Sequence, residues 1–348
     1  MSVAQPASAP GRAASEVIAL VAERTLPFDL SVWQWGDAIA VDGLLDAAEL
    51  LGEGRYREHV TRFFRSWAQR QPSWMDHLTP GLGLVRLARD LDDPALLEAA
   101  LRLARWLRAV PHTDTGLPLY RPDMGTVRHS CWVDTIYHEP SFFLLLADVT
   151  GDDSYRSDAV AVWTSHTTAL SSPRGPFLAH SWESANRLLR GYGWGRGNAW
   201  AFLGMVDALE LMPAGLPGRD ACQREFESLA TALVEAQHAS GLWRTLLHDR
   251  EAYLESSCTA MFGAAFTKAS RLGLLPDRYL EAAERAWRAV QPYVDDEGRL
   301  YGVSAWTHAA ITRDDDPGYY RTLPTETNWW GQGAALRAAA ERWRAGLT

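Results

Sequence analysis

The chain has 348 residues, of which 47% are hydrophobic and 22% charged, and these proportions are typical of a globular protein with one large domain or two ordinary ones. Its net charge of −9 argues against nucleic acid or an anionic membrane as a partner, because no basic stripe is present to neutralise phosphates. Sixteen tryptophans are more than core packing needs, and they are typical of proteins that lay sugar rings against indoles.

The ends and the cysteines indicate the compartment. Residues 1–14 are rich in Ala, Ser and Pro and predict a disordered N-terminus, without the apolar core of a signal peptide. No later run approaches membrane-spanning length. Cys131, Cys222 and Cys258 are odd in number and lack metal-ligand spacing, so we expect reduced thiols. The sequence therefore predicts a cytoplasmic protein, a monomer or a homodimer, in which residues 15–348 form one domain.

From residue 15 onward, apolar residues recur at three- and four-residue spacing, with turn residues between the segments. This pattern predicts an all-α protein of twelve helices. In chain order they are Ser15–Arg24, Trp33–Leu51, Tyr56–Gln69, Leu78–Leu91, Ala95–Ala109, Thr135–Thr150, Tyr155–Thr168, Asn198–Leu211, Arg219–His238, Ser256–Leu272, Arg278–Pro292 and Trp329–Ala345.

The predicted helices are of two alternating kinds. The first member of each pair is rich in Gly and Ala, whereas the second carries Arg and Glu on an exposed face. Because small residues permit close approach, we expect the first member to be inner and the second outer. Six such hairpins would form a closed toroid, an (α/α)6 barrel, if Ser15–Arg24 and Trp329–Ala345 complete the sixth pair. An open helical solenoid is the alternative.

Aromatic and charged residues concentrate just before the inner helices, which would place them on one rim of the barrel. They include Trp35, Trp74, Asp76, Trp132, Asp134, Trp194, Arg196, Glu255 and Trp329. The long connections of the chain end at the same rim. The sequence therefore predicts a binding cleft on that face.

Asp134 is the first candidate catalytic residue. It lies between aromatic residues in Trp132-Val-Asp-Thr-Ile-Tyr137, and burial against aromatic walls can raise the pKa of a carboxyl enough to keep its proton near neutral pH. The alternative is that Asp134 caps the helix that begins there. Asp76 occupies the equivalent place in the preceding hairpin and has the same two interpretations. If the fold brings the two acids together, the pair suits hydrolysis of a sugar bond.

Two further residues are candidates for substrate binding. His180, next to Trp182, has either a structural or a functional role, since histidine readily changes protonation near neutral pH. Arg196 has Gly on both sides in Trp194-Gly-Arg-Gly-Asn-Ala-Trp200, so it can stack on indoles or bind a carboxylate through two hydrogen bonds. Because HExxH, CxxC and GxSxG motifs are absent, metalloprotease, redox and serine-hydrolase functions have no support. We expect an enzyme without a metal or a cofactor.

With these residues assembled, the chain resembles the unsaturated rhamnogalacturonyl hydrolases of glycoside hydrolase family 105, which are related to the unsaturated glucuronyl hydrolases of family 88. The resemblance covers nearly the whole chain. The blocks that carry it are Met75–Gly81, Trp132–Tyr137, His180–Trp182, Trp194–Trp200, Gly241–Trp243 and Glu255–Met261.

The resemblance implies an (α/α)6 barrel that removes a 4,5-unsaturated uronic acid from the non-reducing end of lyase-generated oligosaccharides. It implies that Asp134 protonates C4 of the vinyl ether and, in its basic form, assists addition of water at C5. Asp76 would orient the substrate or tune Asp134, and His180 and Arg196 would hold the uronate. The expected aromatic contacts to the substrate are Trp132, Trp200, Trp35 and Trp182.

The chain departs from the family pattern at four rim positions. Thr135, Ser181 and Ala199 stand where the family commonly has Gly, and His138 stands where it commonly has Met. These departures affect the subsite beyond the uronate, where Arg121 or Arg128 could face an acidic or sulfated unit. Two other functions are kept as alternatives: a sugar epimerase of the N-acylglucosamine epimerase type, which shares the barrel, and a non-catalytic saccharide-binding barrel.

Overall fold

The computed structural model describes residues 11–30, 35–76, 78–125, 127–308 and 317–347, and most of them are helical. An inner ring of helices runs through the middle of the molecule. Its members are α2 (Asp37–Leu51), α4 (Gly81–Asp90), α6 (Thr135–His138) with α7 (Pro140–Thr150), α9 (Gly195–Leu211), α11 (Ser256–Arg271) and α14 (Trp329–Arg344). Each member contacts the next, and α14 contacts α2, so the ring is closed.

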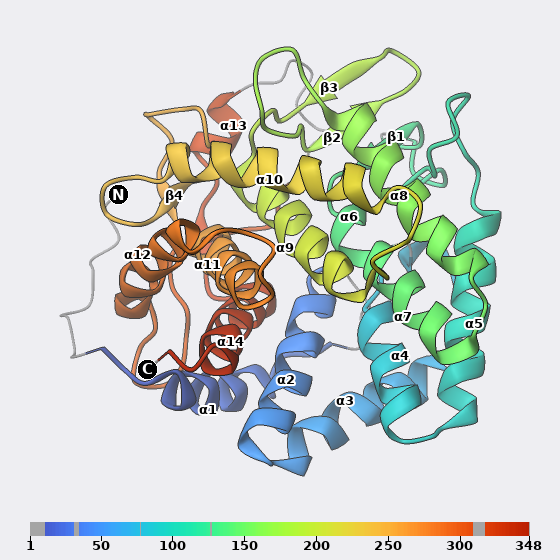
Figure 1. The fold of residues 1–348 in the computed structure, drawn as a ribbon, viewed down its shortest axis with the longest axis horizontal. Coiled ribbons are helices and arrows are strands. Elements are labelled where there is room, and N and C mark those ends of the chain that lie inside the picture. The colour runs from blue at the N-terminus through green and yellow to red at the C-terminus, as the bar shows by residue number, and fades with distance from the viewer. Residues whose placement is uncertain (1–10, 31–34, 77, 126, 309–316, 348) are drawn as a thin grey trace.

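An outer layer covers this ring. It consists of α1 (Ala14–Thr25), α3 (Gly54–Trp67), α5 (Pro94–Ala109), α8 (Ser154–Leu170), α10 (Arg219–Ala236) and α12 (Leu280–Val290). Figure 1 shows α10, α12, α1 and α3 outside α9, α11, α14 and α2. The two layers differ as their sequences predict: α9 is buried without a gap from Gly195 to Leu209, whereas α3 buries only one face.

The closure of the ring depends on small residues. A Cβ atom added to Gly43 of α2 would lie 2.7 Å from the Cβ of Leu336, and one added to Gly333 of α14 would lie 2.5 Å from the carbonyl carbon of Ile39. Glycine is therefore needed where the two helices touch. The predicted (α/α)6 barrel is confirmed, and the open solenoid is wrong.

The predicted helices are present, with differences at their ends. The helix predicted over Thr135–Thr150 is divided at Glu139, because Pro140 has no N–H with which to bond the carbonyl of Ile136. The helix predicted to begin at Trp33 begins at Asp37 in the described residues, and residues 31–34 lie outside them.

Short strands and one short helix lie on the loops of the rim, and the alternation of apolar and polar residues before Glu183 had indicated the strand β2. β1 (Ser130–Trp132), β2 (Ser181–Glu183) and β3 (Leu188–Arg190) form an antiparallel sheet; β4 (Trp243–Arg244) pairs with β5 (Leu254–Glu255), and β6 (Val303–Ser304) with β7 (Thr325–Glu326). The helix α13 (Pro317–Arg321) lies near β3 in Figure 1. These pairings fix loops that are far apart in the sequence.

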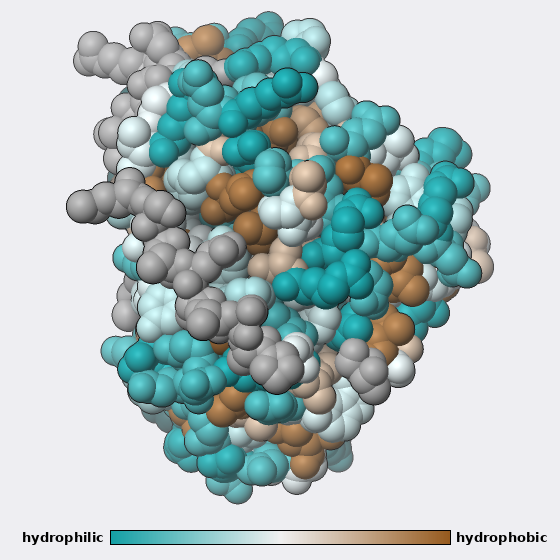
Figure 2. Space-filling model, turned by 90° about the vertical axis from the view of Figure 1, so that its left-hand side faces the viewer, coloured by the Kyte–Doolittle hydropathy of each residue, from teal (hydrophilic) through white to brown (hydrophobic). Residues whose placement is uncertain are grey.

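Of the segment expected to be disordered, residues 1–10 lie outside the described part. Arg12 is described, and its backbone N–H donates to Gln291 while its guanidinium donates to the carbonyl of Val294. Among the described residues, no helix has both the length and the apolar character needed to cross a membrane. Figure 2 shows the hydrophobic residues of one face in small, separate groups.

A ring of alternating charges joins the C-terminal halves of four inner helices, at the end of the barrel opposite to the rim. Neighbouring members of this charge ring have N···O distances from 2.5 to 3.6 Å. In order around the circuit they are Asp46, Arg337, Asp207, Lys268, Glu210, Arg271, Glu341 and Arg344. They surround a cavity of about 290 Å³. The helices are thus tied together electrostatically at this end.

We predict that Arg337→Met lowers the free energy of unfolding by about 3–5 kcal/mol, because it leaves buried Asp207 and Asp46 without this partner. Denaturant titration of both proteins measures the difference. Arg105→Met is the matched control, since Arg105 forms an exposed ion pair with Glu98, and it should change stability by less than about 1 kcal/mol. Equal losses would contradict a special contribution of the charge ring.

Candidate active site

A strand pairing brings Asp134 and His180 together. β1 is followed by Val133 and then by Asp134. The backbone N–H of Val133 donates to the carbonyl of His180 over 2.9 Å. As a result, Nε2 of His180 lies 3.9 Å from Oδ2 of Asp134. The sequence predicted that both residues belong to one site, and the structure places them side by side.

Asp134 is a buried carboxyl, 4% exposed, whose Oδ2 has no hydrogen-bond partner in the described part of the chain. Burial raises the pKa of Asp134 to about 7, against a smaller lowering by the positive charge of Arg196. Although Asp134 occupies the N-cap position of α6, its side chain makes no capping hydrogen bond. The interpretation of this side chain as a helix cap is therefore wrong, and near neutral pH the group can give or accept a proton.

His180 is held in a cage of aromatic rings. Its Nδ1 lies 3.0 Å from the hydroxyl of Tyr320, its ring lies 3.8 Å from that of Trp194, and Trp132 meets it edge-on at 4.8 Å. Burial, helped by the charge of Arg196, lowers the pKa of His180 well below its usual value. The imidazole is therefore neutral near pH 7 and faces Asp134 as a hydrogen-bonding group, not as a cation.

Arg196 is also buried, but its terminal nitrogens bind a loop of the protein. Nη1 donates to the carbonyl and hydroxyl of Ser304, and Nη2 donates to the carbonyl of Ala305 and the hydroxyl of Thr307. The guanidinium lies 5.0 Å from the ring centre of Trp194. A two-point contact with a uronate, as expected from the sequence, would require these loop bonds to be exchanged.

The predicted tryptophans Trp35 and Trp200 form an aromatic wall beside Arg196. Trp35 packs against Trp200 at 6.1 Å, against Trp306 at 5.4 Å and against Trp330 at 4.7 Å between ring centres. Trp200 is fully buried, whereas Trp306 is 46% exposed. The wall therefore runs from the inner helices to the surface, and Trp306 is its accessible end.

Asp76 is bound by its own segment of the chain. It ends the short helix η1 (Trp74–Asp76) and accepts hydrogen bonds from Arg70 at 2.7 Å, from Trp67 at 2.9 Å and from the N–H of Ser73. Among the described residues, no hydrogen bond joins it to Asp134. Since α4 begins after an N-cap at Pro80, Asp76 does not cap that helix either. These contacts give it a structural role before α4.

Trp182 lies on the other face of the small sheet from Trp132. It is the strand partner of Cys131, between Ser181 and Glu183, which pair with Trp132 and Ser130. Side chains alternate between the two faces of a strand, so Trp182 points away from the Trp132 side and packs against the core. The structure therefore does not bring it to the site with the other predicted tryptophans.

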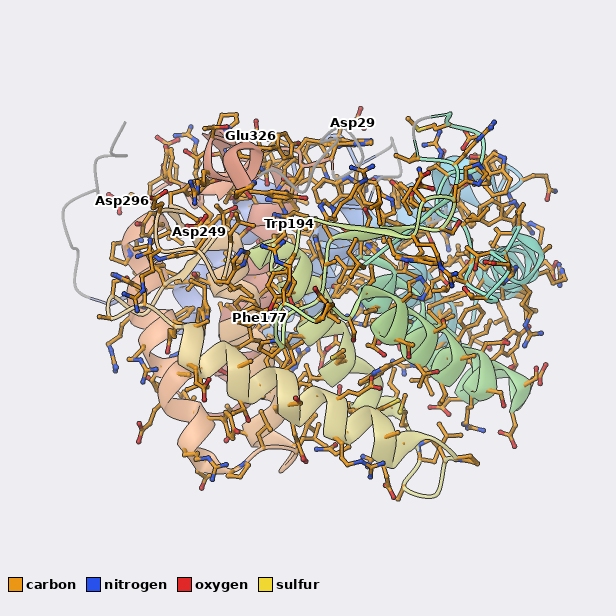
Figure 3. The ribbon with its side chains drawn as sticks, turned by 90° about the horizontal axis from the view of Figure 1, so that it is seen from above. Asp29, Phe177, Trp194, Asp249, Asp296 and Glu326 are labelled. Atoms are coloured by element: carbon orange, nitrogen blue, oxygen red, sulfur yellow. The ribbon has the colours of Figure 1, made fainter. Side chains whose placement is uncertain are left out.

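The sequence-based site list omitted several residues that contact the predicted ones. Trp194 belongs to the Trp-Gly-Arg block and could have been found there; in Figure 3 it lies near the middle of the molecule, whereas Asp29 and Asp296 lie near its edge. Tyr320 and His308, which packs at 5.3 Å on Trp132, come from rim segments without a periodic pattern. The described residues contain no group of three His, Cys, Asp or Glu placed to hold a metal ion.

A helical barrel whose rim carries a buried carboxyl of raised pKa among tryptophans fits an enzyme that acts on sugars by acid–base catalysis. The family model for Glycosyl Hydrolase Family 88 matches residues 17–345, and the chain belongs to this family. The resemblance found in the sequence is thereby confirmed, and the epimerase alternative is wrong.

Individual relatives agree with this assignment. The chain is 27% identical over 337 residues to the unsaturated rhamnogalacturonyl hydrolase YesR of Bacillus subtilis, covering 94% of each chain. It shares its fold with a possible member of the GH105 family from Klebsiella pneumoniae at a TM-score of 0.85, with 23% identity over 99% of each chain. It also matches the unsaturated glucuronyl hydrolase of Bacillus sp. GL1 at a TM-score of 0.73, with 18% identity over 96% of each chain.

We predict that the carboxyl of Asp134 titrates near pH 7 in ¹³C NMR of protein labelled at the Asp carboxyl carbons, above that of Asp42, whose pKa burial raises to about 6, and that only the signal near pH 7 is absent in Asp134→Asn. Because the folded pKa lies above the ordinary value of 3.8, the native state loses stability as the pH rises from about 4 to about 7, and the variant should not show this loss. Asp123→Asn, which removes an aspartate whose pKa is lowered by Arg121, should leave the signal in place. A spectrum without such a carboxyl would contradict the argument from burial.

Proposed function

We propose that this protein removes a 4,5-unsaturated uronic acid from the non-reducing end of oligosaccharides that polysaccharide lyases produce. The observation that carries the proposal is the state of Asp134, a buried carboxyl with a pKa near 7 beside a neutral histidine. Membership of family 88 and the similarity to an unsaturated rhamnogalacturonyl hydrolase support it.

The chemistry needs one group that acts first as an acid and then as a base. Asp134 donates its proton to C4 of the vinyl ether, which develops positive charge at C5 and the ring oxygen. The carboxylate then accepts a proton from the water that adds to C5. The resulting hemiketal opens and the rest of the oligosaccharide leaves. A pKa near the working pH keeps both forms of Asp134 accessible, and general acid–base catalysis contributes roughly 10²–10⁴ in rate.

The surroundings of Asp134 fit this single-acid mechanism. Ordinary glycosidases use two carboxyls that flank the bond, whereas Asp76, the expected second acid, is bound to Arg70 and Trp67. We infer that Asp134 works without a second carboxyl and without a covalent intermediate. The positive charge of Arg196 acts on Asp134 and favours the carboxylate that the water-addition step requires.

The remaining site residues would bind and orient the sugar. His180 presents a neutral ring beside Asp134, so it can donate or accept a hydrogen bond with a sugar hydroxyl. The exposed Trp306 offers an apolar face for a sugar ring, whereas Trp132 is buried and packs against His180. We further propose that the enzyme works in the cytoplasm, as a monomer or homodimer. The free, buried cysteines support a reducing compartment; they are Cys131, Cys222 and Cys258.

Asp134→Asn should lower kcat by roughly 10²–10⁴, because the amide can neither donate the proton nor accept one from water. Turnover is followed by the loss of ultraviolet absorbance of an unsaturated uronyl disaccharide, and binding by calorimetry. Binding should be largely kept, since the two side chains have the same shape. Trp182→Leu is a control on the opposite sheet face and should retain turnover. Full activity of Asp134→Asn would exclude Asp134 as the acid.

The pH dependence of kcat/KM should report the pKa of Asp134 in the enzyme without bound substrate. Because only its protonated form can start the reaction, kcat/KM should fall roughly tenfold per pH unit above about pH 7. Initial rates at low substrate concentration across a pH series measure this profile. A value that stays constant to about pH 9 would be incompatible with an essential acid of this pKa.

A further inference from the structure

The short helix α13 places one phenol hydroxyl against the imidazole of the active site. Tyr320 belongs to α13, is 1% exposed, and its hydroxyl lies 3.0 Å from Nδ1 of His180. The other ring nitrogen of His180, Nε2, is the one that faces Asp134. Tyr320 and Asp134 are thus on opposite sides of the same ring, and Tyr320 can act on Asp134 only through His180.

The position of α13 on the rim is fixed by polar contacts on both sides of Tyr320. Arg321 donates to Oδ2 of Asp249 over 2.6 Å and lies 2.8 Å from Glu251. The hydroxyl of Tyr319 accepts a hydrogen bond from the N–H of His308 over 2.9 Å. The neighbours of Tyr320 in the chain therefore hold the helix, and the hydroxyl of Tyr320 is left to meet the imidazole.

Gly191 makes room for this hydroxyl. It follows β3, beside which α13 lies in Figure 1, and its carbonyl accepts a hydrogen bond from the N–H of His180 over 3.2 Å. Its φ of 63° lies in the left-handed region, which favours glycine. A Cβ atom at position 191 would overlap the hydroxyl of Tyr320 and would lie 2.9 Å from the Cβ of His180. A larger residue would therefore push the hydroxyl away from the imidazole.

On its other side, His180 has an unused hydrogen-bonding atom. Nε2 of His180 and Oδ2 of Asp134 lie 3.9 Å apart, and neither has a hydrogen-bond partner in the part of the chain that the structure describes. Because burial keeps the imidazole neutral, only one of its two nitrogens carries a hydrogen. The hydrogen bond made by one nitrogen decides the state of the other. The contact at Nδ1 therefore determines what Asp134 meets at Nε2.

The chemistry of the two groups favours one direction for the hydrogen bond. A phenol O–H is a stronger donor than a neutral imidazole N–H, and an unprotonated imidazole nitrogen is a stronger acceptor than a phenol oxygen. Tyr320 is thus expected to donate to Nδ1 of His180. The ring hydrogen is then on Nε2 and points to the side of Asp134.

We propose that Tyr320 is a positioning residue that fixes His180 in the tautomer with its hydrogen on Nε2, ready to meet the carboxylate that Asp134 becomes after protonating the substrate. The inference rests on the proposed function and deepens it. If the gap of 3.9 Å closes by about 1 Å, the N–H and the carboxylate form a charge-assisted hydrogen bond. The carboxylate exists only once the proton is on its way to C4, so this bond lowers the barrier and does not strengthen substrate binding.

The other titratable and charged groups around the pair come from three further segments. Arg196 acts on both His180 and Asp134, His308 acts on His180, and Tyr120 interacts with Asp134. Replacing Tyr320 by Phe removes one hydroxyl and leaves these groups in place. A change in the titration of Asp134 in that variant therefore reports the state of His180.

The direct test is ¹⁵N NMR of the full-length protein labelled at its histidine ring nitrogens. The chain has ten histidines, so the signals of His180 are identified by their absence in His180→Asn. In the wild type they should show the hydrogen on Nε2. In Tyr320→Phe the tautomer with the hydrogen on Nδ1 should become populated, because nothing donates to Nδ1 any longer.

The same variant should change the titration of Asp134 in ¹³C NMR. An unprotonated Nε2 accepts a hydrogen bond from the protonated carboxyl and holds its proton, so the pKa of Asp134 should rise above its value of about 7 in the wild type. With an unsaturated uronyl disaccharide, kcat should fall roughly tenfold, the effect of one charge-assisted hydrogen bond, and KM should stay nearly the same.

Tyr319→Phe is the matched control, since it removes a hydroxyl from the same helix whose partner is the N–H of His308. The tautomer of His180 and the pKa of Asp134 should stay those of the wild type. If Tyr320 only fills space, its replacement admits water to the site and the pKa of Asp134 falls toward the ordinary value of 3.8. That result, or a wild-type His180 with its hydrogen on Nδ1, would overturn the proposal. If no unsaturated uronide is turned over, the proposed function fails, whereas the two NMR experiments still decide whether Tyr320 fixes the tautomer.

Discussion

The contact between α2 and α14 is the constraint on which the rest of the structure depends, since it turns a row of helical hairpins into a ring. An open stack would leave the inner faces of its first and last hairpins uncovered. Here Gly43 and Gly333 let the backbones approach closely enough to close the gap. Closure also sets the N-termini of the inner helices on one rim and completes the charge ring at the other end. The reactive and the stabilising ends of the barrel therefore have the same origin.

At the two ends of the barrel, the pKa values of buried acids shift in opposite directions. Burial alone would raise the pKa of Asp207, but Arg337 and Lys268 touch it directly and hold its pKa below the usual value, so it stays ionised. Asp134 is buried as deeply, yet no Lys or Arg of the described residues forms an ion pair with it, and its pKa rises to about 7. Burial is thus common to both acids, and the distance to a positive charge decides between a structural ion and a proton donor.

Periodicity predicted the inner and outer helices because the spacing of apolar residues shows whether one face of a helix or its whole circumference is buried. The blocks around Asp134, Trp132 and His180 predicted the centre of the site through their resemblance to the family, and the pairing of β1 with β2 brings Asp134 and His180 together. What the sequence could not predict depends on long-range geometry. The polar groups of Asp76 and Arg196 could bind either a ligand or another part of the protein. Only the folded structure shows that Asp76 binds Arg70 and that Arg196 binds the segment from Ser304 onward. Trp182 was misplaced because one step in strand register decides which face a side chain takes.

The hydrogen bond between His180 and Tyr320 joins residues 140 positions apart, and that between Arg196 and Thr307 joins residues 111 positions apart. Contacts of such high sequence separation form late, because the entropy of closing the intervening loops must be overcome before they can stabilise anything. The inner hairpins can begin to form locally as the chain leaves the ribosome, but the cage around His180 has to wait for α13. During synthesis the cage around His180 therefore stays incomplete until almost the whole chain has emerged.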